Sequence, residues 1–115
     1  MHESLTFVQS RAFTEFWESF LDDDDLLELQ QLLVQHPDAG DPLPGCGVLR
    51  KIRVANRRHR RGKRGGFRVI YMHTPLARRI DLLVVYPKSH VSGLHPGTVR
   101  SLCATARRKI GRAHV

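Results

Sequence analysis

The residues best suited to chemistry are four cations in the second half of the chain. Lys51 and Arg53 are two positions apart in an alternating run, so a strand would present both on one side. Arg68 lies inside an apolar run, where a charge is costly unless it is paired or used, and Lys88 directly follows another apolar run. We expect Lys51, Arg53 and Arg68 to share one sheet surface, with Lys88 at its border. A solvated basic face is the ordinary alternative, but these placements favour a phosphate-binding surface.

Such a cluster of cations could cleave RNA as well as bind it. Cleavage requires removal of the 2′-hydroxyl proton, stabilisation of negative charge on the phosphorane and protonation of the leaving 5′-oxygen. Guanidinium groups suit the second task, because their forked donors match phosphate oxygens and stay charged. Crowded cations lower the pKa of a lysine, which makes a lysine a candidate acid or base near neutral pH. Since arginine is a poor base, the residues leave the acid and base roles open.

Other common catalytic sites lack the residues they need. The seven histidines include no pair at i, i+4 spacing with a carboxylate, so the sequence has no zinc motif of that kind. Paired carboxylates for glycosidase chemistry are missing from the basic half, which holds only Asp81. Gly62, Gly65 and Gly66 are not followed by the Gly-Lys-Ser/Thr of a nucleotide-binding loop. We therefore expect neither a metal nor a cofactor.

The charges of this 115-residue chain are strongly separated along the sequence. There are 19 lysines and arginines against 11 acids, a net charge of +8. Residues 1–47 carry ten acids and one base, a net charge of −9, whereas residues 48–115 carry eighteen bases and one acid, a net charge of +17. A hydrophobic fraction of 41% is too high for a disordered basic tail. A polyanion is thus the expected partner of a folded domain.

Length and composition also indicate the kind of protein. We expect one domain over residues 1–115. No run of about eighteen apolar residues is present, and the N-terminus lacks a secretory signal, so a cytoplasmic protein is predicted. Cys46 and Cys103 lie far apart in sequence without a partner motif. The prediction for them is reduced thiols rather than a disulfide or a zinc site.

The N-terminal part predicts a strand followed by two acidic helices. Residues 4–9 alternate, and Ser10 is a plausible cap for the helix that follows. That helix has an amphipathic apolar stripe, best explained as core packing, at Phe13, Phe16, Trp17, Phe20 and Leu21. The carboxylates of residues 22–25 suit the N-terminus of a second helix, where the helix dipole attracts negative charge. This helix should end near His36, because Pro37 follows.

The remaining segments predict three consecutive strands and a final helix. A turn-rich loop over residues 37–47 precedes a strand over 48–55, which has Ile52 and Val54 on one face. Residues 67–73 and 79–86 form a predicted hairpin, and Thr98 is a candidate cap for the terminal helix. The expected fold is α+β in the order β-α-α-β-β-β-α. It has a mostly antiparallel four-stranded sheet, two N-terminal helices on one face and an exposed basic opposite face.

A strongly basic loop connects the first two of these three strands. Its six cations in eight residues are Arg57, Arg58, Arg60, Arg61, Lys63 and Arg64. The loop has no interleaved aromatic residue, which suits the backbone of ribosomal RNA better than the reading of bases. A flexible, solvated loop is the alternative, but its length exceeds that of most hairpin connections and favours a function.

Three segments in the basic half carry a family resemblance: Gly47-Val-Leu-Arg-Lys-Ile-Arg-Val-Ala55, Gly62-Lys-Arg-Gly-Gly66 and Phe67-Arg-Val-Ile-Tyr71. Tyr86-Pro-Lys88 and a terminal helix follow in the same order. In combination they resemble toxins of the RelE/HigB superfamily and are similar to its HigB-type branch. The resemblance implies a RelE-like α+β domain that is the toxin of a type II toxin–antitoxin pair. Such a toxin enters the ribosomal A site, cleaves mRNA there without a metal and so inhibits translation. It is neutralised by an antitoxin, for which a small helix-turn-helix protein would fit.

The resemblance also implies roles for individual residues. The two cationic strand residues of the family motif match Lys51 and Arg53, the phosphate-stabilising arginine matches Arg68, and the basic residue after the last strand matches Lys88. Some members have an arginine where this chain has Ser89.

A base-stacking tyrosine of some members falls near His95. His90, His95 and Tyr71 are candidates for the missing acid or stacking group. Each has an ordinary alternative, as a loop histidine or a core-facing tyrosine.

Two other kinds of protein would also fit the sequence. One is a non-catalytic RNA- or DNA-binding module on the same fold. The other is an interaction protein whose acidic helices are the working surface, in which case reversing the charges of Asp22 to Asp25 would matter more than losing Lys51 or Arg68.

Overall fold

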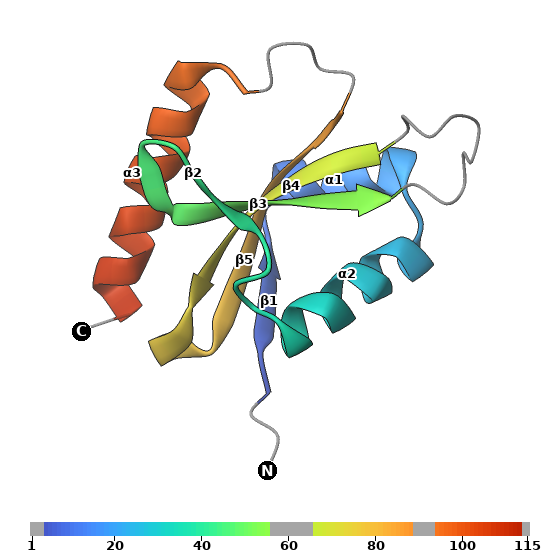
Figure 1. Ribbon diagram of the computed structural model, residues 1–115, viewed down its shortest axis with the longest axis horizontal. Helices are drawn as coiled ribbons and strands as arrows, with labels where there is room; N and C mark the ends of the chain where they lie inside the picture. Colours follow the sequence, from blue (N-terminus) through green and yellow to red (C-terminus); the bar gives the residue numbers. More distant parts are fainter. Residues whose placement is uncertain (1–3, 56–65, 89–93, 114–115) are drawn as a thin grey trace.

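The computed structural model describes residues 4–55, 66–88 and 94–113, which form a sheet with helices on both of its sides (Figure 1). The strands are β1 (Thr6–Gln9), β2 (Asp41–Leu43), β3 (Cys46–Ala55), β4 (Gly66–Thr74) and β5 (Arg79–Pro87). The helices are α1 (Arg11–Phe20), α2 (Asp23–Gln35) and α3 (Pro96–Ala113), with a 3₁₀ turn, η2 (Pro75–Ala77), between β4 and β5. None of the helices in these ranges is long and apolar enough to cross a membrane.

The sheet has the strand order β1-β5-β4-β3-β2. Its three long strands pair antiparallel, as does β2 with β3, while β1 pairs parallel with β5. The prediction of a mostly antiparallel α+β sheet is therefore confirmed. The sheet contains one strand more than predicted, because β2 lies in the segment predicted as a turn-rich loop. Three residues, one of them a proline, are too few to show an alternating pattern.

The two N-terminal helices begin where the sequence predicts. Ser10 Oγ accepts a hydrogen bond of 3.0 Å from the Phe13 backbone N–H and so caps α1. Asp22 caps α2 in the same way through Asp25 N–H at 2.9 Å, and the Asp25 carboxylate accepts from the Asp22 backbone N–H in return. The acidic run thus stabilises a helix end, as expected. The α2 helix ends before His36.

The face of the sheet under α1 and α2 holds the larger apolar core. Phe13 and Trp17 of α1 stack with their ring centroids 5.3 Å apart, and Leu29 and Leu33 of α2 are buried beside them. The strands contribute Ile52, Val54, Phe67, Val69, Tyr71, Ile80, Leu82 and Val85. The predicted apolar face of the strand over 48–55 is thus confirmed, as is that of the first helix except at Phe20, which is 51% exposed.

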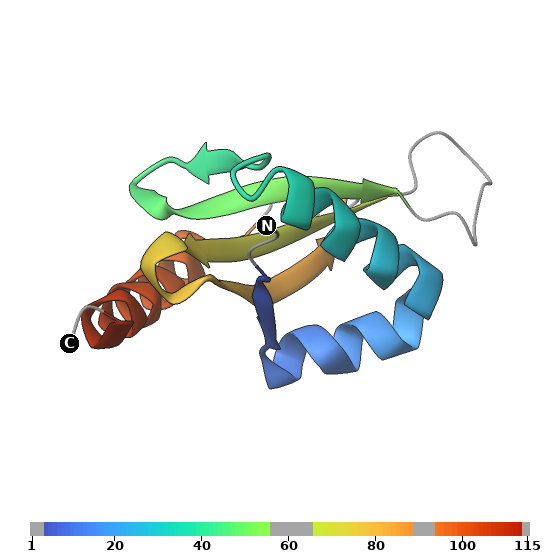
Figure 2. The same cartoon turned by 90° about the horizontal axis from the view of Figure 1, so that it is seen from below.

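The opposite face of the sheet is partly covered by α3, which Figures 1 and 2 show on the other side from α1 and α2. Ala106 of α3 is buried there with Leu49, Ile70, Met72 and Leu83. The expectation of a fully exposed opposite face was wrong. Because β4 is buried on both of its faces, a helix must shield its second row of apolar side chains from water.

The start of α3 also differs from the prediction. His95 caps the helix: its carbonyl accepts from Thr98 and Val99 N–H, and its Nδ1 accepts from Gly97 N–H at 2.9 Å. Thr98 lies in the first turn and is not the cap. His95 resembles Ser and Asp here, because a ring nitrogen can accept the same kind of backbone hydrogen bond.

The two cysteines form a disulfide, contrary to the prediction of reduced thiols. Cys46 begins β3 and Cys103 lies in α3, 57 residues further along the chain. The face of the sheet opposite α1 and α2 is called the second face below. Docking of α3 on this face brings the two sulfurs together. Sequence spacing carried no sign of this, because the pairing depends on where the helix packs.

Candidate functional site

Three polar side chains lie in one row across the second face of the sheet. Arg53 of β3 is the direct partner of Arg68 of β4, and Arg68 is the direct partner of Tyr86 of β5. Directly opposite residues in antiparallel strands have Cβ atoms about 5 Å apart. The two arginines that the sequence assigned to one surface are thus nearest neighbours.

Arg68 is at the centre of this row and is poorly satisfied. Its Nη1 is buried and has no hydrogen-bond acceptor, and no carboxylate in the described ranges forms an ion pair with it. A buried donor without a partner costs about 1–3 kcal/mol, and like charges directly opposite each other in a sheet are destabilising. An anion bound between Arg53 and Arg68 would remove both costs.

Lys51 and Lys88 extend the basic surface in two directions. Lys51 is two residues before Arg53 on β3, pairs with Ile70 and is half-buried. Lys88 directly follows β5, where its backbone N–H donates to the Gly66 carbonyl at 2.9 Å, and its side chain is exposed. The four predicted cations therefore lie on adjacent strands, with Lys88 at the border as expected.

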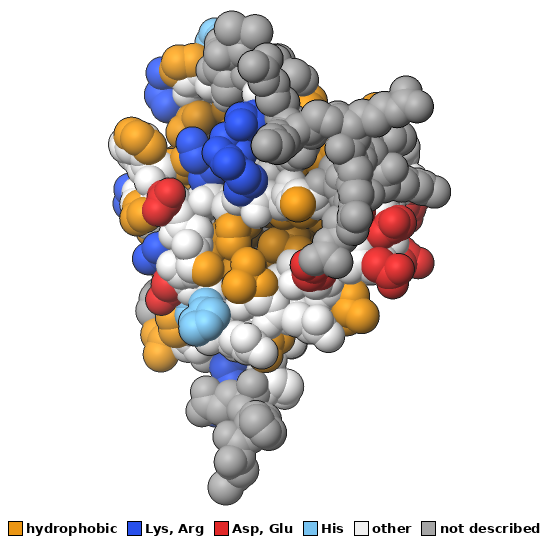
Figure 3. Space-filling view, turned by 45° about the vertical axis from the view of Figure 1, so that its right-hand side comes forward, with side chains coloured by type: hydrophobic (Ala, Val, Ile, Leu, Met, Phe, Trp, Pro, Cys, Tyr) orange, Lys and Arg blue, Asp and Glu red, His pale blue; other side chains and the backbone are white. Residues whose placement is uncertain are grey.

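Two of the four cations have acidic neighbours, and one of these is Lys51, whose direct partner on β2 is Asp41. The other is Arg53, which lines a cavity of about 210 Å³ with Asp25 and Glu28 of α2. The Arg53 side chain is exposed and forms no ion pair with a carboxylate among the described residues. Figure 3 shows the largest group of lysine and arginine side chains in the upper middle of the view, with others along the left-hand edge, and the larger groups of acidic side chains toward the right-hand edge.

Tyr86 was not identified as a site residue from the sequence, although it ends the row beside Arg68. It is half-buried and packs against the apolar side chains between α3 and the sheet. Burial raises the pKa of its hydroxyl, and the positive charge of Arg68 opposes that rise. The phenol is therefore a weaker acid than a free tyrosine and stays protonated at neutral pH, where it can donate a hydrogen bond or give a proton to a strongly basic oxygen. Only the strand register, which the sequence does not display, reveals this neighbour.

The other predicted acid or stacking groups are placed differently. Tyr71 is fully buried on the first face, where its hydroxyl donates to the Pro37 carbonyl and accepts from Gly40 N–H, at 2.8 and 2.9 Å. Burial raises its pKa, which the Gly40 hydrogen bond partly offsets. Its ordinary alternative, a core tyrosine, is therefore correct, and His95 is occupied in capping α3.

Some predicted residues lie outside the described ranges. These are Ser89, His90 and the basic-loop residues Arg57, Arg58, Arg60, Arg61, Lys63 and Arg64. Within the described ranges no group of three or more His, Cys, Asp or Glu side chains is arranged to hold a metal ion.

Comparison with solved structures identifies the fold. No protein-family model matches the chain. A double arginine-to-alanine mutant of E. coli toxin RelE in the free state matches with a TM-score of 0.56 and 17% identity, over 90% of this chain and 97% of that chain. A chain of the archaeal RelE–RelB complex from Pyrococcus horikoshii OT3 matches with a TM-score of 0.51 and 22% identity, over 76% and 99%. Isolated E. coli RelE matches with 0.50 and 18%, over 86% and 99%.

These similarities define the structural class, a small α+β domain with the fold of the RelE toxins. The predicted RelE-like fold is thus confirmed.

Proposed function

We propose that this protein is the toxin of a type II toxin–antitoxin pair and cleaves mRNA in the ribosomal A site. The observation that carries the proposal is the pair of directly opposed arginines, Arg53 and Arg68, with one buried guanidinium nitrogen left without an acceptor. A bound phosphate would satisfy that donor and separate the two positive charges. The RelE-like fold supports the same conclusion.

In this proposal the residues of the row and the two lysines beside it have different roles in cleavage. Arg68, with Arg53 beside it, stabilises the negative charge that develops on the phosphorane. Lys51 and Lys88 flank the row, and either can bind phosphate or exchange a proton. Tyr86 lies beside Arg68 and can protonate the leaving 5′-oxygen or stack on a base. Metal-independent acid/base chemistry is the expected mechanism.

The proposed partners follow from the fold and from the charge. The archaeal structure is a RelE–RelB complex, which supports a cognate antitoxin for this chain, with a helix-turn-helix DNA-binding protein as the proposed type. Ribosomal RNA and mRNA are the proposed polyanions, and the six cations of the basic loop are the proposed contacts to the rRNA backbone. The HigB-type branch and a cytoplasmic location belong to the same proposal.

Growth arrest with a matched control tests the proposal. The wild-type chain, Arg68→Ala and Arg108→Ala would each be induced in cells, and mRNA cleavage would be measured by primer extension on programmed ribosomes. Arg68→Ala should relieve the arrest and slow cleavage at least about 100-fold, because it removes a donor to the transition state. Arg108→Ala removes the same charge from an exposed position on α3 and should change neither.

Three outcomes would contradict parts of the proposal. A wild-type chain that neither arrests growth nor cleaves mRNA would refute the toxin function. Ribosome binding without cleavage would favour the non-catalytic RNA-binding module. Unchanged cleavage by Arg68→Ala, with an unchanged thermal melt, would move the active site elsewhere.

A further inference from the structure

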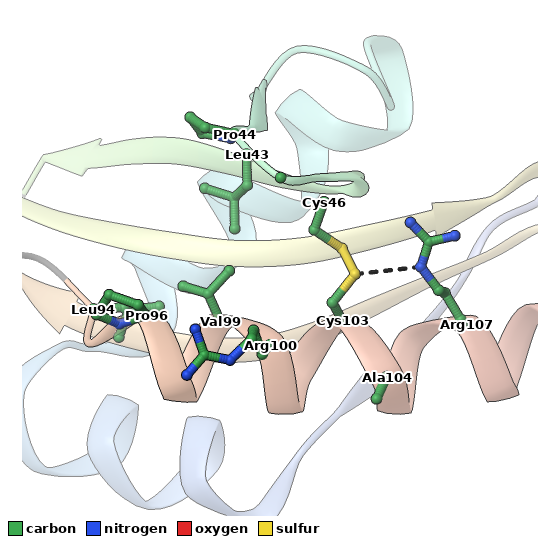
Figure 4. A pocket seen from close by; sticks show the side chains of 11 residues that line it. Leu43, Pro44, Cys46, Leu94, Pro96, Val99, Arg100, Cys103, Ala104 and Arg107 are labelled. Atoms are coloured by element: carbon green, nitrogen blue, oxygen red, sulfur yellow. Dashed lines mark hydrogen bonds between the residues drawn. A yellow bond between two sulfur atoms is a disulfide. The ribbon is translucent and has the colours of Figure 1, made fainter.

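A groove of about 660 Å³ runs between α3 and the turn that joins β2 to β3. Figure 4 shows Leu43 and Pro44 on one side, Val99 and Arg100 on the other, and the Cys46–Cys103 bond in the wall between them. Both half-cystines line this groove, so a small molecule that enters it reaches the disulfide.

The two cysteines of the bond differ in exposure. Cys46 is only 1% exposed and is packed in the second apolar cluster, whereas Cys103 is half-buried on α3. Thiol–disulfide exchange requires a thiolate to approach one sulfur in line with the bond. Access therefore selects Cys103 as the sulfur that is attacked and Cys46 as the leaving sulfur.

A cation lies beside the accessible sulfur. Arg107, one turn further along α3, donates from Nε to Cys103 Sγ at 3.4 Å, drawn as the dashed line in Figure 4. Arg100 also lines the groove, and its lining residues include no carboxylate. Positive charge next to a sulfur attracts an incoming thiolate and favours the thiolate form of a cysteine.

We propose that the Cys46–Cys103 bond is a reversible thiol–disulfide exchange site for small thiols, with Cys103 as the attacked sulfur and Arg107 as its positioning residue. Exchange at this bond does not require that the chain cleave RNA.

The exchange proceeds in two balanced steps. A thiolate of the small thiol bonds to Cys103 Sγ, the Cys46–Cys103 bond breaks, and its electron pair leaves on Cys46 Sγ, which takes up a proton. A second thiolate then bonds to the small-molecule sulfur of this mixed disulfide and releases Cys103 as a thiolate beside Arg107. Two small thiolates are oxidised to one small disulfide, and the protein is reduced to a thiol at Cys46 and a thiolate at Cys103.

Reduction would remove the covalent link between β3 and α3. Among the described residues, α3 is then held by its apolar contacts and by the ion pair from Lys109 Nζ to Asp81, at 3.3 Å. These contacts keep α3 docked, but without the disulfide its local opening is less costly. The redox state of this bond thus sets how firmly α3 is held on the sheet face that bears Lys51 and Arg68.

Reduction kinetics test the exchange site. The oxidised full-length chain would be treated with glutathione under native conditions, and free thiols would be counted by maleimide mass shift. Reduction should be much faster than global unfolding, and Arg107→Gln should slow it about fivefold through the lost charge. The matched variant Arg108→Gln removes a neighbouring charge that does not contact Cys103 and should leave the rate unchanged.

Hydrogen exchange provides the second readout. The amides of α3 should exchange faster in the reduced chain, while those of β4 and β5 should keep their protection. Reduction at the rate of global unfolding, or equal slowing by both arginine variants, would refute the exchange site. Identical α3 protection in the two redox states would refute its effect on the helix.

Discussion

The second face of the sheet has an ion-paired buried charge at one end and a partly buried charge without an anionic partner at the other. At one end Asp81 is 1% exposed and pairs with Arg79 Nε at 3.0 Å and with Lys109 Nζ at 3.3 Å. At the other end Arg68 has a buried nitrogen and no anionic partner in the described part of the chain. A charge that serves the fold alone is expected to be paired, because burial makes an unpaired charge costly. The contrast supports a role for Arg68 toward an external anion.

The largest expected effect on stability comes from the paired end. Asp81→Asn removes the carboxylate charge that Arg79 and Lys109 share. We expect a loss of about 3 kcal/mol in the free energy of unfolding, since the cations are partly exposed and the loss falls at the low end for a broken buried pair. Urea denaturation would measure it.

Asp38→Asn is the matched control for that change. Asp38 pairs with Arg50 and His73, but its side chain is 64% exposed. An exposed pair is worth about 0–1 kcal/mol, so this variant should lose less than about 1 kcal/mol. Equal losses for Asp38→Asn and Asp81→Asn would mean that burial does not distinguish the two acids.

A smaller effect is expected at the unpaired end. Arg68→Met keeps an apolar stem but removes the charge opposite Arg53 and the unsatisfied donor. Stability should stay the same or rise by up to about 1 kcal/mol, while RNA cleavage is lost. Thermal melts and the ribosome assay would be run on the same preparation. A loss of more than about 2 kcal/mol would show that Arg68 has a structural partner.

The smallest expected effect on stability is at Asp25, a buried acid without a cationic partner among the described ion pairs. Burial raises its pKa above 3.8, and its hydrogen bond from the Asp22 backbone partly opposes this. A carboxyl whose pKa is raised by folding adds stability below its unfolded pKa, and that contribution is lost as pH rises through the folded pKa. Asp25→Asn should therefore become more favourable relative to wild type as pH increases from 3 to 7, by a few tenths of a kcal/mol.

Asp23→Asn is the control for this pH dependence. Asp23 lies in the same first turn of α2 but is exposed. Its carboxylate interacts favourably with the helix dipole, so the substitution should lower the free energy of unfolding by about 0.3–1 kcal/mol at pH 7. Denaturation across pH would compare the two variants, and a parallel trend for both would contradict the burial argument.

Most of the helices and strands, and the cations of the site, could be predicted from the sequence, whereas Tyr86 could not. Apolar periodicity located the helices and long strands, and alternation placed Lys51 and Arg53 on one side of β3. Periodicity assigns a side chain to a face but not to a row. The alignment of Arg53 with Arg68 and Tyr86 depends on hydrogen-bond register between strands, so the sequence missed Tyr86.

The position of α3 was the other feature that local patterns could not provide. Its amphipathic stripe indicates a buried side but not the surface that buries it. Alternation places Leu49 on the same side of β3 as Lys51 and Arg53. This apolar residue was the available signal that part of the basic face is covered. The disulfide follows from that docking and was missed for the same reason.

The parallel pairing of β1 with β5 sets an order on how this chain can fold. Thr6 is aligned with Arg79, so nearly the whole sheet must be synthesised before the first strand finds its partner. Closing so large a loop is slow, because its entropic cost is paid before the contacts form. During synthesis α1 and α2 leave the ribosome without a sheet to cover. The nascent chain therefore exposes Phe13 and Trp17 until β5 emerges, which makes this interval the one most open to aggregation or chaperone binding.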